Sequence, residues 1–366
     1  MKKLLACLCL TLLCFAACMT AQAAAVPSAQ NFQVDGKTVK TEIYNIDGNN
    51  YFKLRDIAML LKGTQSGFSV DYDAGTGMIS ISGGSDYAPV GGELETGVDR
   101  SASCVASPQK LLVNGKDTQL KAYNIGGNNF FKLRDLGDLL SFYVGYREDT
   151  KTAVVLSSCS IRHTDYSKGM PADIYFEIPV FKGNSNAVKQ VNQFFEDVEK
   201  QYAAGENLAY ARELITGDLE NGHGPTAENP YLAGNDAAVH SLTDSLISVS
   251  IDYSWFMGGV FDYGSNGYTF NAKTGDRLYL NDVLDGSDQQ IKESIVRSLL
   301  QQYPGVENAG VMNTPMDEIR GMDIKEIDFI VSDSHVSAIF DKYEIAAGMA
   351  GMFVVTLPDA LSAAFA

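Results

Sequence analysis

The strongest constraint on the fold of this chain is an internal repeat. Residues Tyr44–Leu61 and Tyr123–Leu140 are identical at 13 of 18 positions, at an offset of 79 residues. The shared residues are turn glycines and asparagines, aromatic and leucine side chains, and the tetrapeptide Lys-Leu-Arg-Asp. They include no histidine, serine or cysteine. We therefore interpret the repeat as two copies of a structural element rather than as two active sites.

Each copy predicts the same succession of turns, helix and strands. The copies begin with Asp35-Gly36 and Asn114-Gly115 between apolar residues, a pattern typical of type I′ hairpins, in which both central residues need a positive φ. A second turn, a short helix with apolar residues at i, i+3 and i+4, and two closing strands follow in each copy. We place the repeats at 30–83 and 110–158. The segment 84–109 between them is rich in glycine, serine and proline, and we expect an exposed loop there.

Two pairs of charges are duplicated with the repeat, Arg55 with Asp56 and Arg134 with Asp135. A catalytic role would require a histidine, a nucleophile or a metal partner nearby, and the repeats contain none at a matching position. We interpret these pairs as salt bridges at the helix starts and between the repeats.

The repeated motifs resemble a known family. VDGK or VNGK, followed by YNIxGNNxFKLRD, a helix and a closing strand, are similar to the copper amine oxidase N-terminal-like stalk domain of exported bacterial proteins. The resemblance covers residues 30–158 and implies a small α+β module that acts as a spacer or as an attachment to the cell envelope. No histidine lies between residues 30 and 158, so we expect no copper there and no other cofactor.

The first 23 residues predict a signal peptide. Two lysines precede the apolar run Leu4–Ala17, and the sequence AQA at 21–23 fits a cleavage site. The run is short for a membrane span, which needs about 20 apolar residues, and we expect no transmembrane anchor in the chain. We predict a protein that is secreted or associated with the cell envelope. A lipoprotein anchored at Cys18 is a weaker alternative, because the preceding FAA departs from the usual lipobox.

The cysteines predict a disulfide. Of six cysteines, four lie in the signal region, and only Cys104 and Cys159 are expected in the mature chain. They flank the second repeat, and a single cysteine pair in an exported protein is typical of a disulfide.

The charge of the chain restricts its partners. The formal net charge is -17, and removal of the two lysines of the signal peptide leaves 26 basic and 45 acidic residues, or -19. Such a surface repels nucleic acid and favours a basic partner.

Residues 160–366 predict a second domain. Its elements are a strand at 173–179, an amphipathic helix at 184–204, a strand at 247–255, a hairpin around 273–276, a helix capped by Ser287 or Asp288, and strands near 327–331, 335–340 and 352–357. In the strand at 247–255, apolar residues alternate with serines and an aspartate, which predicts one buried and one solvated face. The whole chain is thus expected to be α+β: a duplicated small antiparallel β/short-helix stalk module, then a mixed sheet with two to three packed helices.

The second half also resembles a known family. The stretch from Ser250 through YSWFMGGVFDYG to LYLNDVL, and DKYEIAAG at 341–348, are similar to the extracellular domain pair of lysozyme-sensing anti-sigma factors and of peptidoglycan deacetylase N-terminal regions. The resemblance implies a binding domain for lysozyme or a peptidoglycan component. The chain departs from the family where Val260-Phe261 replace the usual Ala-His, which puts any role of that histidine in doubt.

We find no catalytic motif and no metal-binding motif in the sequence. The patterns of nucleophile elbows, zinc hydrolases, phosphate-binding loops and dinucleotide-binding loops are absent. The four histidines are scattered. We therefore expect no catalytic residues and no metal ligands.

The best candidate for function is an aromatic surface beside Gly258 and Gly259. Aromatic rings next to a glycine turn suit a sugar ring or a protein partner. Trp255 lies on the apolar side of its strand, so core packing is the favoured role for this residue, whereas Phe256 and Phe261 are better candidates for exposure. The candidate binding residues are Trp255, Phe256, Gly258, Gly259, Phe261, Asp262 and Tyr263.

These observations predict a non-enzymatic, exported binding or sensing protein in which a stalk carries a recognition domain. The expected ligand is a basic protein such as lysozyme, or a peptidoglycan component. Two alternatives stay open at this point: a wall-active hydrolase or deacetylase, and a purely structural spacer.

Overall fold

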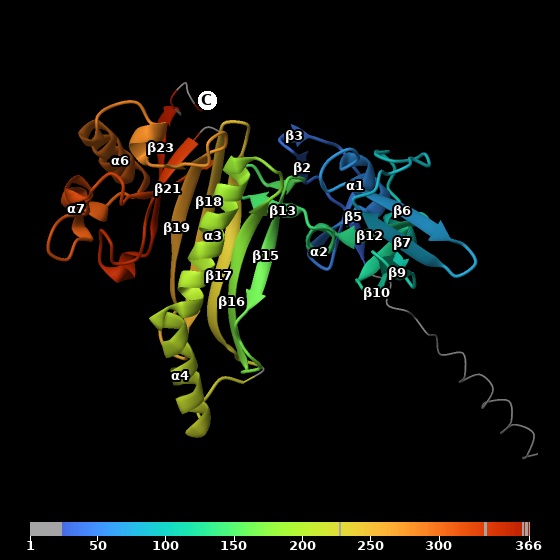
Figure 1. The fold of residues 1–366 in the computed structure, drawn as a ribbon, viewed down its shortest axis with the longest axis horizontal. Coiled ribbons are helices and arrows are strands. Elements are labelled where there is room, and N and C mark those ends of the chain that lie inside the picture. The colour runs from blue at the N-terminus through green and yellow to red at the C-terminus, as the bar shows by residue number, and fades with distance from the viewer. Residues whose placement is uncertain (1–23, 227, 333–334, 361, 363–364, 366) are drawn as a thin grey trace, which may run out of the picture. The chain divides into compact units, whose positions relative to one another are not determined.

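The computed structural model describes residues 24–226, 228–332, 335–360, 362 and 365. The predicted signal peptide and Cys18 lie outside these residues. The described chain is α+β, as expected, and it divides into two compact units. The first unit contains the described residues up to Leu140 together with Arg147–Ala153, and the second contains Ser141–Tyr146 and the chain from Val154 onward. Figure 1 shows the elements of both units.

The first unit holds both repeats. Its elements, with the two strands through which the chain passes to the second unit, are β1 (Ala25–Pro27), β2 (Asn31–Val34), β3 (Lys37–Thr38), β4 (Ile43–Ile46), β5 (Asn49–Lys53), α1 (Leu54–Leu60), β6 (Phe68–Asp73), β7 (Met78–Gly83), β8 (Val105–Ala106), β9 (Lys110–Val113), β10 (Lys116–Thr118), β11 (Ala122–Ile125), β12 (Asn128–Lys132), α2 (Leu133–Leu140), β13 (Tyr143–Arg147) and β14 (Thr152–Leu156).

The repeated hairpins meet at the centre of one sheet. β4–β5 and β11–β12 join through an antiparallel pairing of β5 with β12, in the strand order β1-β4-β5-β12-β11-β8. The predicted turns are confirmed: Asp35 and Gly36 have φ of 46° and 74°, and Asn114 and Gly115 have 49° and 78°. Aromatic side chains from both hairpins form the core of this sheet, with Tyr51 and Tyr123 rings 5.0 Å apart, edge to face.

The repeats complete each other's sheets. The closing strands of the first repeat, β6 and β7, continue into the opening hairpin of the second in the order β10-β9-β7-β6, with β7 and β9 parallel. In the other direction, the turn Arg147–Ala153 of the second repeat forms hydrogen bonds with side chains of β2 in the first repeat. The Asn31 amide donates to the Thr150 carbonyl at 3.1 Å, and the Arg147 guanidinium donates to the Gln33 side chain at 3.2 Å. The two copies of the expected framework are therefore interlocked, because each forms hydrogen bonds with strands of the other.

Most residues of the segment 84–109 are exposed, as expected, but a few of its side chains anchor it to the rest of the unit. Tyr87 is 1% exposed, and its hydroxyl donates to Glu93 at 2.6 Å. Arg100 forms an ion pair of 2.9 Å with the buried carboxylate of Glu42. The backbone amide of Leu94 donates to Asp56 at 2.9 Å. A prediction based on the glycine, serine and proline content of the segment could not identify these few anchoring side chains.

The duplicated charges have different surroundings in the two copies. Asp56 is fully buried and pairs at 3.5 Å with Lys53, itself buried and three residues earlier in the chain. Arg55 donates to the hydroxyl of Tyr87 at 3.2 Å. The described contacts of Asp56 and Arg55 therefore lie within the first repeat and segment 84–109, and the expectation of a bridge between the repeats was wrong for this pair.

The second unit contains two sheets and most of the helices. Its further elements are β15 (Cys159–Asp165), β16 (Ala172–Phe181), α3 (Asn186–Ala204), α4 (Glu206–Glu220), β17 (Tyr231–Leu242), β18 (Leu246–Phe256), β19 (Asp262–Asn271), β20 (Arg277–Leu278), α5 (Leu280–Val283), α6 (Asp288–Gln302), α7 (Pro315–Gly321), β21 (Asp328–Ser332), β22 (His335–Phe340) and β23 (Phe353–Ala360).

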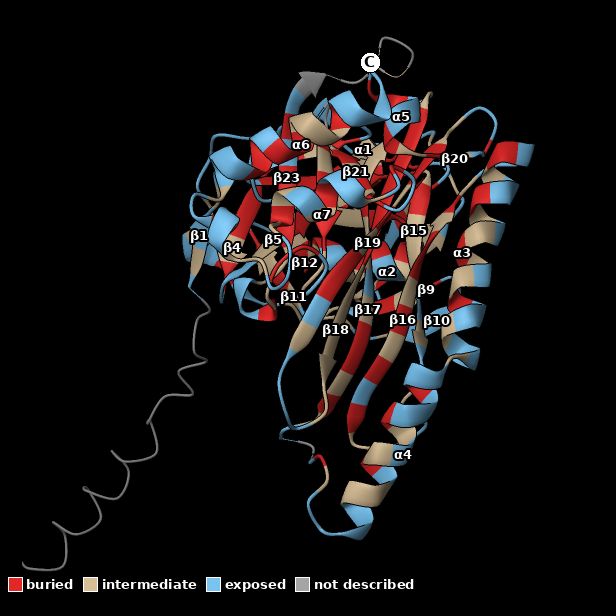
Figure 2. Ribbon diagram, turned by 90° about the vertical axis from the view of Figure 1, so that its left-hand side faces the viewer, coloured by how far each residue is buried: buried red, intermediate tan, exposed pale blue. Residues whose placement is uncertain are grey.

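The six strands β15 to β20 form the larger sheet in chain order, and β21 to β23 form the smaller one. Helix α3 packs on the larger sheet through Val191 and Phe195, which are buried, while its opposite side is exposed (Figure 2). As predicted, Ser287 caps α6, whose Ile291, Ile295, Val296 and Leu299 are buried. None of the helices among the described residues is long and apolar enough to cross a membrane.

The alternation in β18 predicted one buried and one solvated face, but the first half of the strand is buried on both faces. Ser248 and Ser250 are buried, because the smaller sheet covers this side: the Ser248 hydroxyl accepts from the Val331 amide at 2.8 Å. The neighbouring strand β17 was not foreseen. It pairs in parallel with β16 and antiparallel with β18.

The expected disulfide between Cys104 and Cys159 is absent, since both thiols are free. Cys104 is buried with Tyr44, Tyr51 and Tyr123 in the core of the first unit. Cys159 is buried in a different core, that of the second unit. Burial raises the pKa of both thiols, that of Cys159 to about 12, which disfavours the thiolate that disulfide exchange requires.

Candidate binding surface

The candidate residues lie at the end of the β18–β19 hairpin. The two strands pair up to Trp255 opposite Asp262, and residues 257–261 form the connection. Gly258 has φ of 79°, and a side chain there would lie 2.7 Å from the hydroxyl of Tyr231. The glycine is therefore required both by the turn and by the close approach of Tyr231.

Trp255 and Phe256 pack against neighbouring elements. Trp255 is half-buried and its ring lies parallel to that of Tyr210 on α4, with centroids 6.4 Å apart. Phe256 is also half-buried and meets Tyr231 edge to face at 6.3 Å. The packing role favoured for Trp255 agrees with these contacts, whereas Phe256 is less exposed than we expected.

The exposed part of the site is formed by Phe261 and Tyr263 together with two residues from a distant loop. Phe261 and Tyr263 are 47% and 37% exposed, and their rings stack at 5.9 Å. Lys342 brings its ammonium 5.9 Å from the Tyr263 ring and 5.6 Å from the ring of Tyr343, which is 70% exposed. We call these residues, with the 79% exposed Val260, the aromatic–lysine surface.

Lys342 holds this surface together. Only 12% of its side chain is exposed, and its ammonium forms an ion pair of 3.3 Å with Asp262 and lies 3.4 Å from the Phe261 carbonyl. A cation between two ring faces is attracted by both. The lysine therefore fixes the spacing of Tyr263 and Tyr343, which stay 37% and 70% exposed.

The loop that carries Tyr343 is anchored below the surface. Asp341 accepts the Ser265 amide at 2.8 Å, and its own amide donates to Glu344 at 2.7 Å. Burial raises the pKa of Asp341. Tyr343 has φ of 72°, which is unfavourable for a bulky residue. Its ring lies where a side chain on Gly348 would have to go. Such strain is characteristic of residues held in place for a function.

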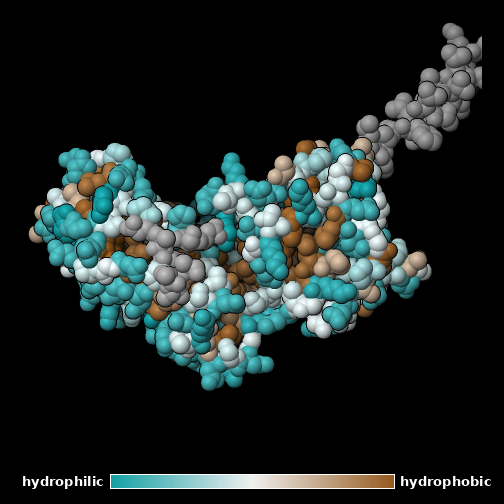
Figure 3. Space-filling view, turned by 90° about the horizontal axis from the view of Figure 1, so that it is seen from above, coloured by the Kyte–Doolittle hydropathy of each residue, from teal (hydrophilic) through white to brown (hydrophobic). Residues whose placement is uncertain are grey.

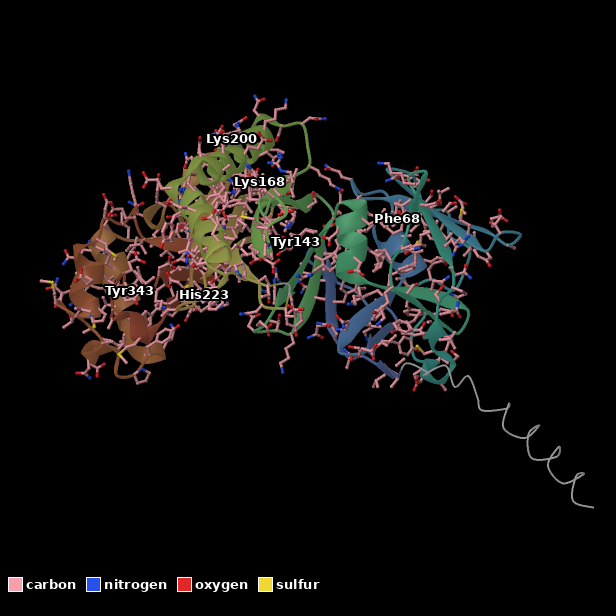
Figure 4. The ribbon with its side chains drawn as sticks, turned by 90° about the horizontal axis from the view of Figure 1, so that it is seen from below. Phe68, Tyr143, Lys168, Lys200, His223 and Tyr343 are labelled. Carbon is pink, nitrogen blue, oxygen red and sulfur yellow. The ribbon has the colours of Figure 1, made fainter. Side chains whose placement is uncertain are left out.

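The sequence did not identify Lys342 and Tyr343 as site residues. They lie about 80 positions after the glycine turn, and only the pairing of β21 to β23 beside β19 brings them near. Figure 4 labels Tyr343 in the C-terminal part of the chain. The tyrosine and the two glycines of 343–351 were visible in the sequence, but nothing in that pattern indicated their partner.

The histidines have structural neighbours. His163 lies 3.3 Å from Glu177 and stacks on Tyr175, and His240 lies 2.9 Å from the Ser250 hydroxyl. Within the part of the chain that the structure describes, no three histidine, cysteine or acidic side chains are placed to hold a metal ion.

The arrangement is suited to adhesion. Exposed ring faces can stack on sugars or on guanidinium groups, and nearby carboxylates favour a cationic partner. Figure 3 shows apolar atoms reaching an otherwise hydrophilic exterior in patches.

Comparison with known proteins gives few matches. Neither a protein-family model nor a curated protein matches the chain. A DUF3298 family member from Bacteroides fragilis NCTC 9343 is a similar solved structure, at 14% identity and a TM-score of 0.39, covering 61% of this chain and 94% of that one. A DUF3298 family protein from Pseudomonas aeruginosa PAO1 matches at 15% identity and a TM-score of 0.34, covering 57% and 93%.

Proposed function

We propose that this chain is an exported, non-enzymatic recognition protein whose second unit binds a basic protein through the aromatic–lysine surface. The observation that carries the proposal is the set of exposed rings of Phe261, Tyr263 and Tyr343 around a lysine that is itself nearly covered. Export is supported by the signal-peptide pattern of residues 1–23. The stalk and anti-sigma-factor resemblances favour the same conclusion.

The charge of the chain supports a basic partner. Asp262 lies beside the rings in an ion pair with Lys342, and the mature chain would carry a charge of -19 (26 basic and 45 acidic residues). Arginine side chains of a partner could stack on the open ring faces while the acidic surface steers the approach. Such steering is screened by salt, whereas stacking is less affected.

The test is binding of the mature chain to lysozyme, measured by calorimetry at low and at high salt. We expect binding that weakens with salt, and a large loss of affinity in Phe261→Ser and Tyr343→Asn. Asparagine is chosen at 343 because it tolerates the left-handed backbone. Met312→Ala, at a side chain that is 94% exposed in the same unit, is the matched control and should bind like the wild type.

Two outcomes would contradict the proposal. Equal binding by the wild type, Phe261→Ser and Tyr343→Asn would remove the surface from recognition. Absence of lysozyme binding at either salt concentration, together with retention on purified peptidoglycan, would replace the basic protein with a wall glycan as the ligand of the same rings. Release of soluble fragments from that peptidoglycan would favour the enzymatic alternative.

A further inference from the structure

The first unit contains a pocket of about 320 Å³ that the proposed function does not use. It lies where the start of α1, the strands β6 and β7 and the second repeat's β11–β12 hairpin come together. Its polar lining is formed by Lys53, Arg55, Gln109, Asn124, Asn128 and Asn129. The asparagines belong to the duplicated NIxGNN motif, which we interpreted as framework.

The charge of the pocket is opposite to that of the chain. Two cations and no carboxylate are among its lining residues, although the chain has 45 acidic and 28 basic residues. Lys53 already pairs with Asp56. Arg55 has two described hydrogen bonds, both long and both from Nη1: 3.4 Å to the Val70 carbonyl and 3.2 Å to the Tyr87 hydroxyl. A guanidinium has five N–H donors, so this residue can still bind an anion.

The pocket also contains an unsatisfied acceptor. The side-chain oxygen of Gln109 is buried and has no hydrogen-bond partner. The nearby Asn129 uses its own oxygen to accept from Ser107 at 2.7 Å. A buried acceptor without a donor is unfavourable, so a ligand that donates an N–H to Gln109 would gain from binding there.

The other copy of the repeat shows what the equivalent of Gln109 binds. Gln30 is the equivalent of Gln109, 79 residues earlier. Its side-chain oxygen accepts from Asn50, and its amide donates to the carbonyl of Lys151 at 3.4 Å. Next to it, Asn31 donates to the carbonyl of Thr150 at 3.1 Å. In the first copy, the amides thus hold peptide groups of the chain itself.

The turns beside the two glutamines differ in sequence. Thr150 and Lys151 belong to the turn after β13, and the equivalent turn after β6 begins with Asp73 where the other has Arg147. The Asp73 carboxylate accepts from the amides of Gly75 and Thr76 at 2.8 and 3.3 Å. In the turn after β13, Asp149 accepts from the amide of Thr150 at 2.7 Å. The side-chain oxygen of Gln109 accepts from neither turn.

We propose that the pocket beside Gln109 binds a short peptide that ends in a free carboxylate. Gln109 would bond a peptide group, as Gln30 does in the other copy, and the asparagines would offer further amide groups to the peptide. Arg55 would bind the terminal carboxylate, for which its planar fork is suited. Tyr72, which lines the pocket and is 51% exposed, offers a ring against the side chain of the ligand. The module would then be a receptor as well as a stalk.

The experiment uses acetyl-Ala-Ala with a free carboxylate and its C-terminal amide as probes, titrated into the mature chain. We expect the carboxylate to bind at least about tenfold more tightly than the amide, as loss of a charged hydrogen bond implies. Arg55→Gln should remove this preference. Arg134→Gln, the equivalent change in the second repeat, is the matched control and should leave it intact.

A second measurement covers the case in which Arg55→Gln does not fold. In the unaltered protein, side-chain amide resonances of Gln109, Asn124 and Asn129 should shift when the carboxylate probe is added, while those of Gln30 and Asn50 should not. The proposal is wrong if both probes bind equally, if neither binds, or if Arg134→Gln loses as much affinity as Arg55→Gln. Shifts confined to residues outside the pocket would also overturn it.

Discussion

The two repeats of the first unit have nearly the same sequence, but equivalent residues contribute differently to stability. In the first repeat, segment 84–109 covers the helix start, so that Lys53 and Asp56 are buried. Their equivalents Lys132 and Asp135 are only half-buried. The comparison shows that a repeated motif fixes the backbone. The contribution of each side chain to stability depends on whether a non-repeated segment covers it.

The largest expected difference between the copies is at the helix starts. Asp56→Ala should lower the free energy of unfolding by about 3–5 kcal/mol, because it leaves the buried ammonium of Lys53 without its carboxylate. Asp135→Ala should lower it far less. Denaturant unfolding of both variants measures the difference, and equal losses would show that segment 84–109 does not set the contribution of this pair.

A smaller difference is expected at Glu42, whose equivalent in the second repeat is Lys121. Arg100→Ala removes the 2.9 Å ion pair of the buried Glu42 and leaves it the Tyr44 hydroxyl as its described partner. Lys121→Ala removes an exposed pair with Asp47, for which little effect is expected. Thermal unfolding should show a clear decrease in Tm for Arg100→Ala and almost none for Lys121→Ala; the reverse order would contradict the burial of Glu42.

The turns give a third test. Asp47 and Gly126 are equivalent, and both have a positive φ, but a side chain at 126 would lie 2.4 Å from Arg100. Gly126→Asp should therefore lower stability by about 1 kcal/mol, since backbone strain and crowding add. Asp47→Gly should change it less. Equal changes in the free energy of unfolding of the two variants, measured with urea, would mean that Arg100 moves aside without loss of stability.

A further difference between the copies is a pH dependence that originates in segment 84–109. Burial acts to raise the pKa of Glu93, but hydrogen bonds from Tyr87 and from the amides of Val90 and Gly91 outweigh it and lower the pKa to about 2. A lowered pKa stabilises the fold above the pKa of the unfolded glutamate, about 4.3, and this contribution is lost as the pH falls through about 2.

Unfolding of the wild type and of Glu93→Gln between pH 5 and pH 2 measures this contribution. The stability advantage of the wild type over the variant should shrink steadily as the pH falls. A constant difference between the wild type and Glu93→Gln would mean that the hydrogen bonds do not favour the ionised carboxylate.

Local features of the fold could be predicted from the sequence. The Asp-Gly and Asn-Gly turns, the cap at Ser287 and the apolar face of α3 depend on residues within a few positions of each other, and the structure has them where expected. Strand β17 was missed because Gly234, Asn235 and Asp236 interrupt its apolar pattern. The glycine is needed there, since a side chain would lie 2.6 Å from the Tyr175 ring.

Features that depend on distant partners could not be predicted. To predict how the repeats exchange strands, one must know which sheet edge each hairpin pairs with. The alternation of apolar and polar residues within a strand does not contain this information. The candidate surface was found only in part for the same reason. Phe261 and Tyr263 lie beside a recognisable glycine turn, whereas Lys342 and Tyr343 join them through the tertiary fold.

The interlocking of the repeats has a consequence for how the chain acquires its structure. The bond from Asn31 to Thr150 spans 119 residues, and contacts of such separation slow folding because a long loop must close first. The opening hairpin must therefore wait, with its edge unpaired, until nearly the whole module has been synthesised. A protein built in this way depends on protection of that edge during synthesis, and a fragment that ends after the first repeat should aggregate instead of forming half a module.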